Sequence, residues 1–273
     1  MKHLQDLLYW IKEREKIRHL KESGAPRPWT DDPILGSYRF CNVYREDDKV
    51  TRWIMSNWLD ANPQSDQLAF AAGVARMVNH PDTLQEIGFP HNWNPQHFIA
   101  VFEDRKRRNL KSWTSAYMIT GGYSEGGEPK EVLIGRILTQ LHSQLKDNPI
   151  VTTDTLESAS KKIKVNGIGT FLGGQIIADL KNTHLLGYAS DWSTWCAVGP
   201  GSTAGLNYLY DRPPCILPED IFRKEVQEVR GLVFDNTGHD LCAQNAQNVL
   251  CEFSKYVRTK YYGGRPKASY PPR

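Results

Sequence analysis

Apolar residues recur every three or four positions along much of this chain, which is the spacing of amphipathic helices. The pattern runs through five segments, at 4–20, 48–61, 66–79, 131–145 and 240–262. The alternation of apolar and polar residues that marks a β-strand is scarce, with 231–240 as a candidate for a short extended piece. We therefore predict a mainly α-helical protein.

The size and composition of the chain fit a folded protein. It has 273 residues, of which 40% are hydrophobic, and these include 8 Trp and 12 Tyr. Such a chain can bury a substantial core and is not expected to be disordered. We expect a single helical domain over 1–262, built from two lobes, followed by a mobile basic tail at 263–273.

Simple patterns exclude several protein classes. There is no apolar run of about 18 residues or more, and the N-terminus interleaves apolar residues with charges, so neither a membrane span nor a secretory signal is expected. The five cysteines are scattered without a Cys-x-x-Cys pair, and no His/Asp/Glu spacing suggests a ligand set. We therefore expect no metal and no other cofactor, with reduced thiols in a cytoplasm.

Basic residues are concentrated in two places, although the net charge is only +3. The segment RKRRNLK at 105–111 carries five, and 254–273 carries six Lys or Arg and no acid. Aromatic residues lie near both segments. A solvated surface is the ordinary explanation for such runs, and nucleic-acid binding is the functional one.

A glycine-rich turn, VNGIG at 165–169, separates two short helical patterns within about 154–181. Asp154 and Glu157 have the spacing of a capping box for the first helix, and Thr170 opens the second. The apolar face of the second helix is expected to contain Phe171, Leu172, Ile176, Ile177 and Leu180. Gly167 and Gly169 would let the backbone approach a phosphate at a helix N-terminus. This helix-hairpin-helix pattern predicts a grip on the DNA backbone; the alternative is an ordinary turn.

A second glycine turn, AVGPGST at 197–203, follows a carboxylate closely. Asp191 is the candidate catalytic group, and a helix cap ahead of WSTWCAV is the alternative for it. Gly199, Gly201 and Ser202 form a candidate anion site, with Ser202 as the expected N-cap of the next helix.

The stretch 28–54 is unusually dense in polar side chains set between apolar ones. Its candidate binding residues are Arg39, Asn42, Tyr44, Arg45 and Asp48. Two arginines with an Asn and a Tyr suit a phosphate or an amino-acid carboxylate, and a surface loop that caps a helix is the alternative.

Two further pairs are weaker candidates. Arg76 and Asn79 sit in ARMVN, where a polar cluster at a helix end explains them equally well. Glu252 and Lys255 share a polar stripe of the last helix with Asn245 and Asn248, opposite the apolar face of Val249, Leu250, Phe253 and Tyr256. Such a stripe is more often solvated than functional.

These motifs together resemble one known family, the alpha-glutamyl/putrescinyl thymine pyrophosphorylases, which are phage proteins related to helix-hairpin-helix DNA glycosylases. The resemblance covers about 10–262 and rests on the segments at 28–54, 70–84, 116–122, 165–203 and 248–258. It implies a helix-hairpin-helix DNA-glycosylase-like helical fold. Asp191, 22 residues after Gly169, aligns with the catalytic aspartate of the glycosylases. Phe171 stands where lyase-type glycosylases carry lysine, which argues against Schiff-base chemistry.

The resemblance also implies an activity, that of an amino acid (or amine):DNA transferase in thymidine hypermodification. Its substrates would be double-stranded DNA containing phosphorylated 5-hydroxymethyluracil and an amino acid or polyamine. The enzyme would act after a DNA-base kinase, in the cytoplasm of a phage-infected host. A flipped base would meet Asp191 as general base, while Arg39, Arg45 and the second glycine turn would hold the leaving phosphate. Asn42, Tyr44 and Asp48 are candidates for the amine or the base edge.

Two alternatives remain open from the sequence. The first is a DNA glycosylase that hydrolyses an N-glycosidic bond with Asp191. The second is a DNA-binding accessory protein without an activity of its own.

Overall fold

The computed structural model describes residues 1–114, 127–266 and 268–271. Over these residues the chain is mainly helical and contains no β-strand, which confirms the predicted helical class. The motif at 116–122 lies outside the described residues. None of the helices in the described ranges combines the length and apolar character needed to cross a bilayer.

The chain forms two compact units. Unit 1 comprises Met1–Asp48 and Ser193–Arg273, and unit 2 comprises Lys49–Trp192. Unit 1 is therefore built from both ends of the sequence, with the whole of unit 2 inserted between its two segments.

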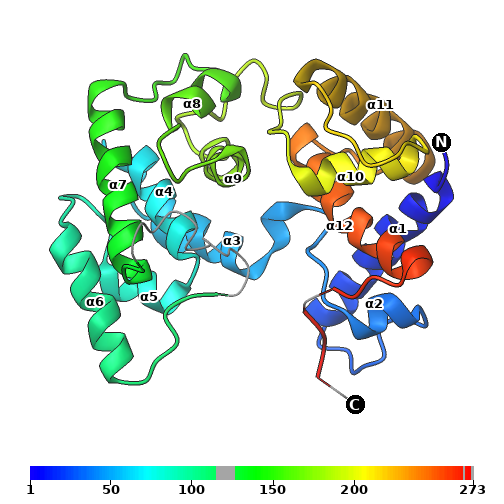
Figure 1. Ribbon diagram of the computed structural model, residues 1–273, viewed down its shortest axis with the longest axis horizontal. Coiled ribbons are helices and arrows are strands. Elements are labelled where there is room, and N and C mark those ends of the chain that lie inside the picture. The colour runs from blue at the N-terminus through cyan, green and yellow to red at the C-terminus, as the bar shows by residue number, and fades with distance from the viewer. Residues whose placement is uncertain (115–126, 267, 272–273) are drawn as a thin grey trace. The chain divides into compact units, whose positions relative to one another are not determined.

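Unit 1 is organised around its longest helix. Its helices are α1 (Leu4–Glu22), α2 (Pro33–Ser37), α10 (Pro200–Leu209), α11 (Glu219–Thr237) and α12 (Ala243–Tyr262), with a 3-10 turn at Arg45–Asp47. Helix α12 packs against α10, α11, α1 and α2 (Figure 1). The apolar face predicted for α12 is confirmed, because Val249, Leu250, Phe253 and Tyr256 are all buried.

The extended piece predicted at 231–240 is wrong. Helix α11 runs through this segment to Thr237, because Val226, Val229 and Val233 are buried at helical spacing. The helix ends at Gly238, whose φ of 73° lies in the left-handed region that glycine adopts without strain.

Part of the tail predicted to be mobile is held in place. The Arg39 N–H donates to the Ala268 carbonyl at 2.9 Å, and the Tyr270 N–H donates to the Ser37 carbonyl at 2.9 Å. These bonds place 268–271 alongside the chain after α2 as a short antiparallel pairing. Sequence composition alone did not reveal this partner.

Unit 2 is a helical bundle. Its helices are α3 (Lys49–Ile54), which continues into a π-helical turn at Met55–Leu59, then α4 (Leu68–Val78), α5 (Pro81–Ile87), α6 (Pro95–Arg107), α7 (Lys130–Asp147), α8 (Leu156–Lys162) and α9 (Thr170–Leu180). Every residue of α4 is buried, and the helix packs against both α7 and α9 (Figure 1). Apart from Arg76, its residues are apolar or small, as expected for a helix at such a central place.

The start of α8 differs from the predicted capping box. Thr155 is the N-cap, and its hydroxyl accepts the Ser158 N–H at 3.0 Å. Asp154 instead accepts the Val151 N–H and the Ser158 hydroxyl, both at 2.8 Å. Asp154 therefore closes the turn that precedes α8 and does not cap the helix.

Candidate functional site

The predicted glycine hairpin is formed by α8, residues 163–169 and α9, all within unit 2. Gly167 has a φ of +95°, and a Cβ atom built there would lie 2.5 Å from Cδ1 of Ile137 on α7. Both the backbone angle and the space therefore require glycine at this position. Thr170 begins α9, as predicted.

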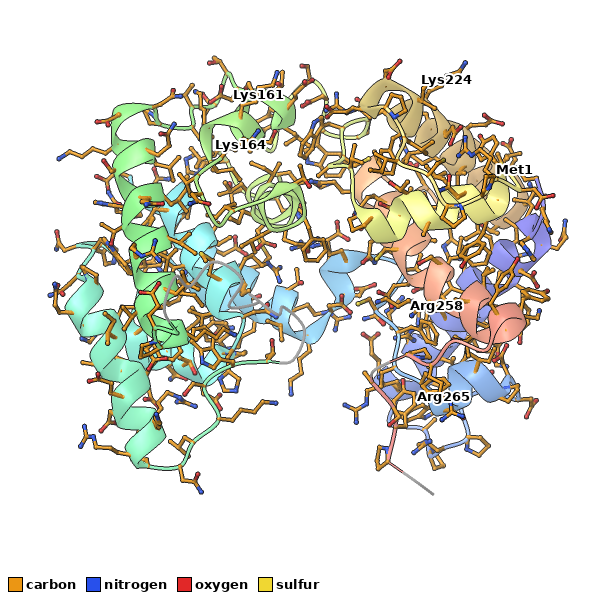
Figure 2. All side chains as sticks on the ribbon, in the orientation of Figure 1. Met1, Lys161, Lys164, Lys224, Arg258 and Arg265 are labelled. Atoms are coloured by element: carbon orange, nitrogen blue, oxygen red, sulfur yellow. The ribbon has the colours of Figure 1, made fainter. Side chains whose placement is uncertain are left out.

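The tip of this hairpin is open to solvent. Gly169 is the N-cap of α9, no side chain caps the helix, and the space around the position of its missing Cβ is empty. Thr170 and Phe171 are exposed, so Phe171 is not part of the buried face to which it was assigned. Lys161 and Lys164 are exposed on the same hairpin (Figure 2). The exposed helix start, the positive end of the helix dipole, Lys164 and Lys161, which also pairs with Glu157, together favour an anion.

The carboxylate of Asp191 is engaged at the start of α8. It accepts the N–H groups of Leu156 at 2.7 Å and of Glu157 at 3.0 Å. Asp191 thus caps α8, and not a helix at WSTWCAV, where the chain forms turns. The glycine turn follows the opposite end of the same helix, so Asp191 and the turn are separated by the length of α8.

The segment that leads to Asp191 is fixed by a residue that the sequence analysis missed. Lys181 follows α9 and is buried, with its Nζ 3.8 Å from the ring centroid of Trp192. The Trp192 indole N–H donates to the Lys181 carbonyl at 2.8 Å. A buried lysine against a tryptophan face is a cation–π contact, and it ties the residue after Asp191 to the end of α9.

Arg76 and Asn79 belong to a buried network in unit 2. Nη2 of Arg76 lies 2.6 Å from Oδ1 of Asp179 and 3.0 Å from the Thr51 hydroxyl. The Asn79 amide donates to the Thr114 hydroxyl at 3.0 Å. The network joins α3, α4 and α9, so its evident role is to hold these helices together. The sequence analysis missed Asp179, although an acid inside the apolar run IIADL was an available signal.

In unit 1, the polar stripe of α12 is covered and not solvated, which corrects the first expectation for it. Asn245 accepts the Arg45 N–H at 3.1 Å, and Asn248 donates to the Asn42 carbonyl at 3.0 Å. Glu252 accepts the Cys41 N–H at 3.2 Å. Asn245 and Glu252 are buried as a result. We call this group the α12 polar cluster, consisting of Arg14, Asn42, Arg45, Asp48, Asn245, Asn248, Glu252 and Lys255.

Arg14 of α1 anchors the loop that covers α12. Its guanidinium donates to the carbonyls of Phe40 at 3.2 Å and Cys41 at 3.1 Å, and to Oδ1 of Asn42 at 2.6 Å. The Asn42 N–H in turn donates to Asp48 at 3.2 Å. Sequence reasoning missed Arg14, because its helical segment reads as amphipathic and nothing in it marks a buried arginine.

Within the α12 polar cluster, Lys255 forms an ion pair with the buried Glu252. Burial raises the pKa of the Asp48 carboxyl above its usual range. Burial by itself would lower the pKa of Lys255, but its ion pair with Glu252 raises that pKa above the usual value. Lys255 is therefore held in its charged form beside a buried carboxylate.

The two candidate arginines of this region have different surroundings. Arg45 is buried under α12, whereas Arg39 is exposed with its guanidinium 5.5 Å from the ring centroid of Tyr270. Tyr44 hydrogen-bonds His239 through its hydroxyl, at 3.1 Å from Nδ1. Arg39 is thus linked to the tail, and Arg45 to the last helix.

The second glycine turn also lies against α12. Gly199 is the N-cap of α10, and Ser202 is buried with its hydroxyl donating to the Gly199 carbonyl at 3.0 Å, so the expected Ser202 cap is wrong. A Cβ atom at Gly201 would lie 2.4 Å from Sγ of Cys251. Gln247 contacts Ser202 at 3.4 Å while its neighbour Asn248 contacts the 42–48 loop. Helix α12 therefore contacts both the second glycine turn and the 42–48 loop.

The predicted residues divide between the two units. Asp191, the hairpin glycines, Thr170, Arg76 and Asn79 belong to unit 2, and the remaining candidates belong to unit 1. Within the described ranges, no group of three or more His, Cys, Asp or Glu side chains could hold a metal ion.

Comparison with known proteins assigns the chain to a family. Residues 1–264 match the family described as 5-hmdU DNA kinase, helical domain. The chain belongs to this family. A 5-hmdU DNA kinase of Bacillus phage SP10 is 24% identical to it over 232 residues, which is 75% of this chain and 36% of the relative. The chain thus spans about a third of the length of this relative.

The match covers both units, so the family corresponds to the helical architecture as a whole. It also supports the phage 5-hydroxymethyluracil context that the sequence motifs indicated, although the family matched is not the pyrophosphorylase family. No solved structure matches the chain.

Proposed function

We propose that this chain binds duplex DNA through the 163–170 hairpin and attaches an amine to phosphorylated 5-hydroxymethyluracil. The observation that carries the DNA-binding part is the exposed, uncapped start of α9 between Gly169 and Phe171, in a chain of the 5-hmdU DNA kinase helical-domain family. Backbone N–H groups at a helix start bind phosphate and read no base edge. The hairpin is therefore suited to binding the DNA backbone independently of the base sequence.

The proposed chemistry is a substitution at the 5-methylene carbon of the base. The amine nitrogen forms a bond to this carbon, the carbon–oxygen bond breaks, and (pyro)phosphate leaves with the electron pair. A base removes the proton that the nitrogen releases, and Asp191 is assigned this role. The Asp191 carboxylate is half-buried, and the hydrogen bonds that it accepts from Leu156 and Glu157 fix its orientation at the start of α8.

The leaving phosphate is assigned to the segments gathered on α12. The candidates for it are Arg39, Arg45, Gly199, Gly201 and Ser202. Asn42, Tyr44 and Asp48 are assigned to the amine or the base edge, with Glu252 and Lys255 completing the α12 polar cluster. The support for this assignment is that one helix contacts both the 42–48 loop and the second glycine turn.

A second candidate function is the presentation of DNA to a kinase. Both the family and the phage relative are described as 5-hmdU DNA kinases, and the chain covers only about a third of that relative. The printed sequence contains no Gly-x-x-x-x-Gly-Lys-Ser/Thr phosphate loop. In this function the chain binds the modified DNA while a separate nucleotide-binding domain transfers the phosphoryl group.

One experiment separates these functions. The protein is incubated with 5-hydroxymethyluracil duplex, untreated or pre-phosphorylated by a DNA-base kinase, together with a pool of amino acids and polyamines. The DNA is then digested to nucleosides for mass spectrometry. The transferase predicts a heavier nucleoside only from phosphorylated DNA, and its absence with every donor overturns that proposal. An abasic site indicates the glycosylase alternative, and faster phosphorylation by the kinase indicates DNA presentation.

A matched pair of variants tests Asp191. Asp191→Asn keeps a cap for α8 through its amide oxygen but removes the base, so nucleoside formation should fall by about a hundredfold or more. Asp235→Asn, on the exposed face of α11, should leave the rate unchanged. Equal rates for both variants would remove Asp191 from the mechanism.

A further inference from the structure

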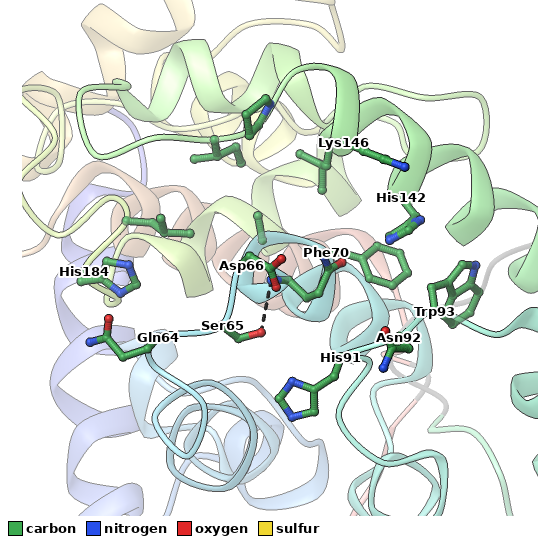
Figure 3. A pocket seen from close by; sticks show the side chains of 16 residues that line it. Gln64, Ser65, Asp66, Phe70, His91, Asn92, Trp93, His142, Lys146 and His184 are labelled. Atoms are coloured by element: carbon green, nitrogen blue, oxygen red, sulfur yellow. Dashed lines mark hydrogen bonds between the residues drawn. The ribbon is translucent and has the colours of Figure 1, made fainter.

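Unit 2 contains a cavity of about 830 Å³ that none of the assigned residues lines. Its walls come from the chain before α4, the first turn of α4, residues 91–93, the C-terminal half of α7, and the loops at 149–150 and 184–185 (Figure 3). A volume of this size is typical of sites for small molecules.

Two opposite charges line this cavity. Asp66 precedes α4, and Lys146 lies in the last turn of α7. Both act on the same imidazole: burial lowers the pKa of His142, the charge of Lys146 lowers it further, and the charge of Asp66 raises it. Among the described residues, neither Asp66 nor Lys146 has an ion-pair partner. The cavity thus offers one carboxylate and one ammonium group to a ligand.

The cavity also has an aromatic wall. The ring centroid of Phe70 lies 5.1 Å from that of Trp93 and 4.9 Å from that of His142, with near-perpendicular planes in both pairs. The Trp93 indole N–H donates to the Thr139 hydroxyl at 2.9 Å, which fixes the orientation of the ring. Figure 3 shows the three rings together on one side of the cavity. Such a wall suits an apolar or aliphatic portion of a ligand.

The lining of the cavity does not include the residues of the hairpin turn. His184 and Leu185 of its lining follow the C-terminal end of α9, whereas Gly169 and Thr170 of the hairpin are at the N-terminal end. Helix α9 has 11 residues, which corresponds to about 16 Å at 1.5 Å per residue. His184 and Leu185 therefore lie about a helix length from the hairpin tip, whereas Pro149 on another wall accepts a hydrogen bond at 2.9 Å from Lys162 at the end of α8.

We propose that this cavity binds a free, zwitterionic α-amino acid. Asp66 receives the ammonium group, Lys146 receives the carboxylate, and the side chain packs on the wall of Phe70 and Trp93. A nucleotide fits the charges less well, because its phosphate would bring at least two negative charges against one lysine and one aspartate. The lowered pKa of His142, caused first by burial and then by Lys146, keeps that ring neutral near pH 7.

This inference deepens the proposed transferase function by naming a site for the amine donor, but binding can be measured without transfer. The test is isothermal titration of the full chain with free α-amino acids that have aliphatic, aromatic and polar side chains. N-acetyl amino acids and decarboxylated amines serve as ligand controls. At least one amino acid should bind, and each blocked analogue should bind at least tenfold more weakly, because it loses one charge-assisted contact.

Variants locate the binding to the cavity. Asp66→Asn and Lys146→Gln should each weaken binding at least tenfold, whereas Asp147→Asn, next to Lys146 but outside the lining, should leave it unchanged. Thermal unfolding of each variant establishes that it is folded. Failure of every amino acid to bind, equal affinities in all variants, or tighter binding of a nucleoside monophosphate overturns the inference.

The outcomes for the cavity and for the transferase are distinguishable. If amino acids bind but no new nucleoside forms, the amino-acid site in the cavity is supported and the transferase function is contradicted. If a new nucleoside forms and the KM for the amino acid is the same in wild type and Asp66→Asn, the transferase function is supported. The cavity is then not the site of the amine donor.

Discussion

Arg76 and Asp179 form a two-pronged ion pair in the interior of unit 2, with Nη2 of Arg76 at 2.6 Å from Oδ1 of Asp179 and Nε donating to Oδ2. Both side chains are almost completely buried. Because the remaining donors of Arg76 reach Thr51 and Asn79, the pair connects α4 and α9 with α3. The orientation of α9, and with it the hairpin tip, depends on this contact.

Breaking this pair should destabilise the protein strongly. Asp179→Asn leaves a buried guanidinium without its counter-charge, which typically costs about 3–5 kcal/mol in the free energy of unfolding. Arg107→Gln removes the exposed pair with Asp104 on α6 and should cost less than about 1 kcal/mol. Urea unfolding followed by circular dichroism measures both. Similar losses for the two variants would contradict the assignment of Arg76–Asp179 as a tie between helices.

Replacing either of two helical glycines by alanine should change the free energy of unfolding, in opposite directions at the two positions. A Cβ atom at Gly205 of α10 would lie 2.3 Å from the Leu250 carbonyl oxygen of α12, so Gly205→Ala should force the helices apart and cost about 1–3 kcal/mol or more. Gly231 lies inside α11 with open space around it, and Gly231→Ala should stabilise by about 0.5–1 kcal/mol. Thermal unfolding compares them. A neutral Gly205→Ala would mean that α10 and α12 are not in close contact.

The hairpin lysines should contribute to DNA affinity through charge alone. Replacing Lys164 by Gln removes one phosphate contact, so duplex affinity should fall and the slope of log K against log salt should decrease by about one. Lys224→Gln, on the exposed face of α11, is the matched control and should change neither value. Fluorescence anisotropy at several salt concentrations gives both quantities. An unchanged slope for Lys164→Gln would place the DNA contact elsewhere.

The stability of the protein should decrease in mild acid because of His142. Burial, assisted by Lys146, lowers the pKa of this ring below the value of about 6.5 that it has in an unfolded chain. As the pH falls through about 6.5, the unfolded state takes up a proton first, so the free energy of unfolding falls. His80 shifts in the same direction, also through burial, and contributes to the same loss.

His142→Gln should therefore reduce the loss of stability between about pH 7.5 and 5.5 without abolishing it. Denaturant unfolding at several pH values measures this. The same pH dependence in wild type and variant would show that the His142 ring is not protected from protonation in the folded state.

Several features could be read from the sequence because they depend on neighbours along the chain. The helical periodicity located α1, α3, α4, α7 and α12 but not α2, α5, α6 or α11. The glycines of VNGIG located the hairpin, since a φ of +95° at Gly167 is a local requirement. The buried face of α12 also followed from its spacing. The extended piece predicted at 231–240 is instead the last part of α11, which ends at Gly238.

The partners of polar side chains could not be read in the same way. The stripe of α12 was expected to be solvated, but Asn245 and Glu252 are buried under a loop that lies about two hundred residues earlier in the chain. Likewise, the alternative considered for Asp191 was a cap of a helix that follows it, but Asp191 caps α8, which begins 35 residues before it. No local pattern encodes a partner at such separations.

The sequence by itself therefore determined the helical class, the hairpin and the buried faces, because backbone preference and apolar periodicity act over a few residues. Only the tertiary structure decided that Arg14 locks the 40–42 loop, that Asp179 pairs with Arg76, and that Asp66 and Lys146 line one cavity. The physical reason is that hydrogen bonds and ion pairs are satisfied by whichever group the packed helices bring within reach.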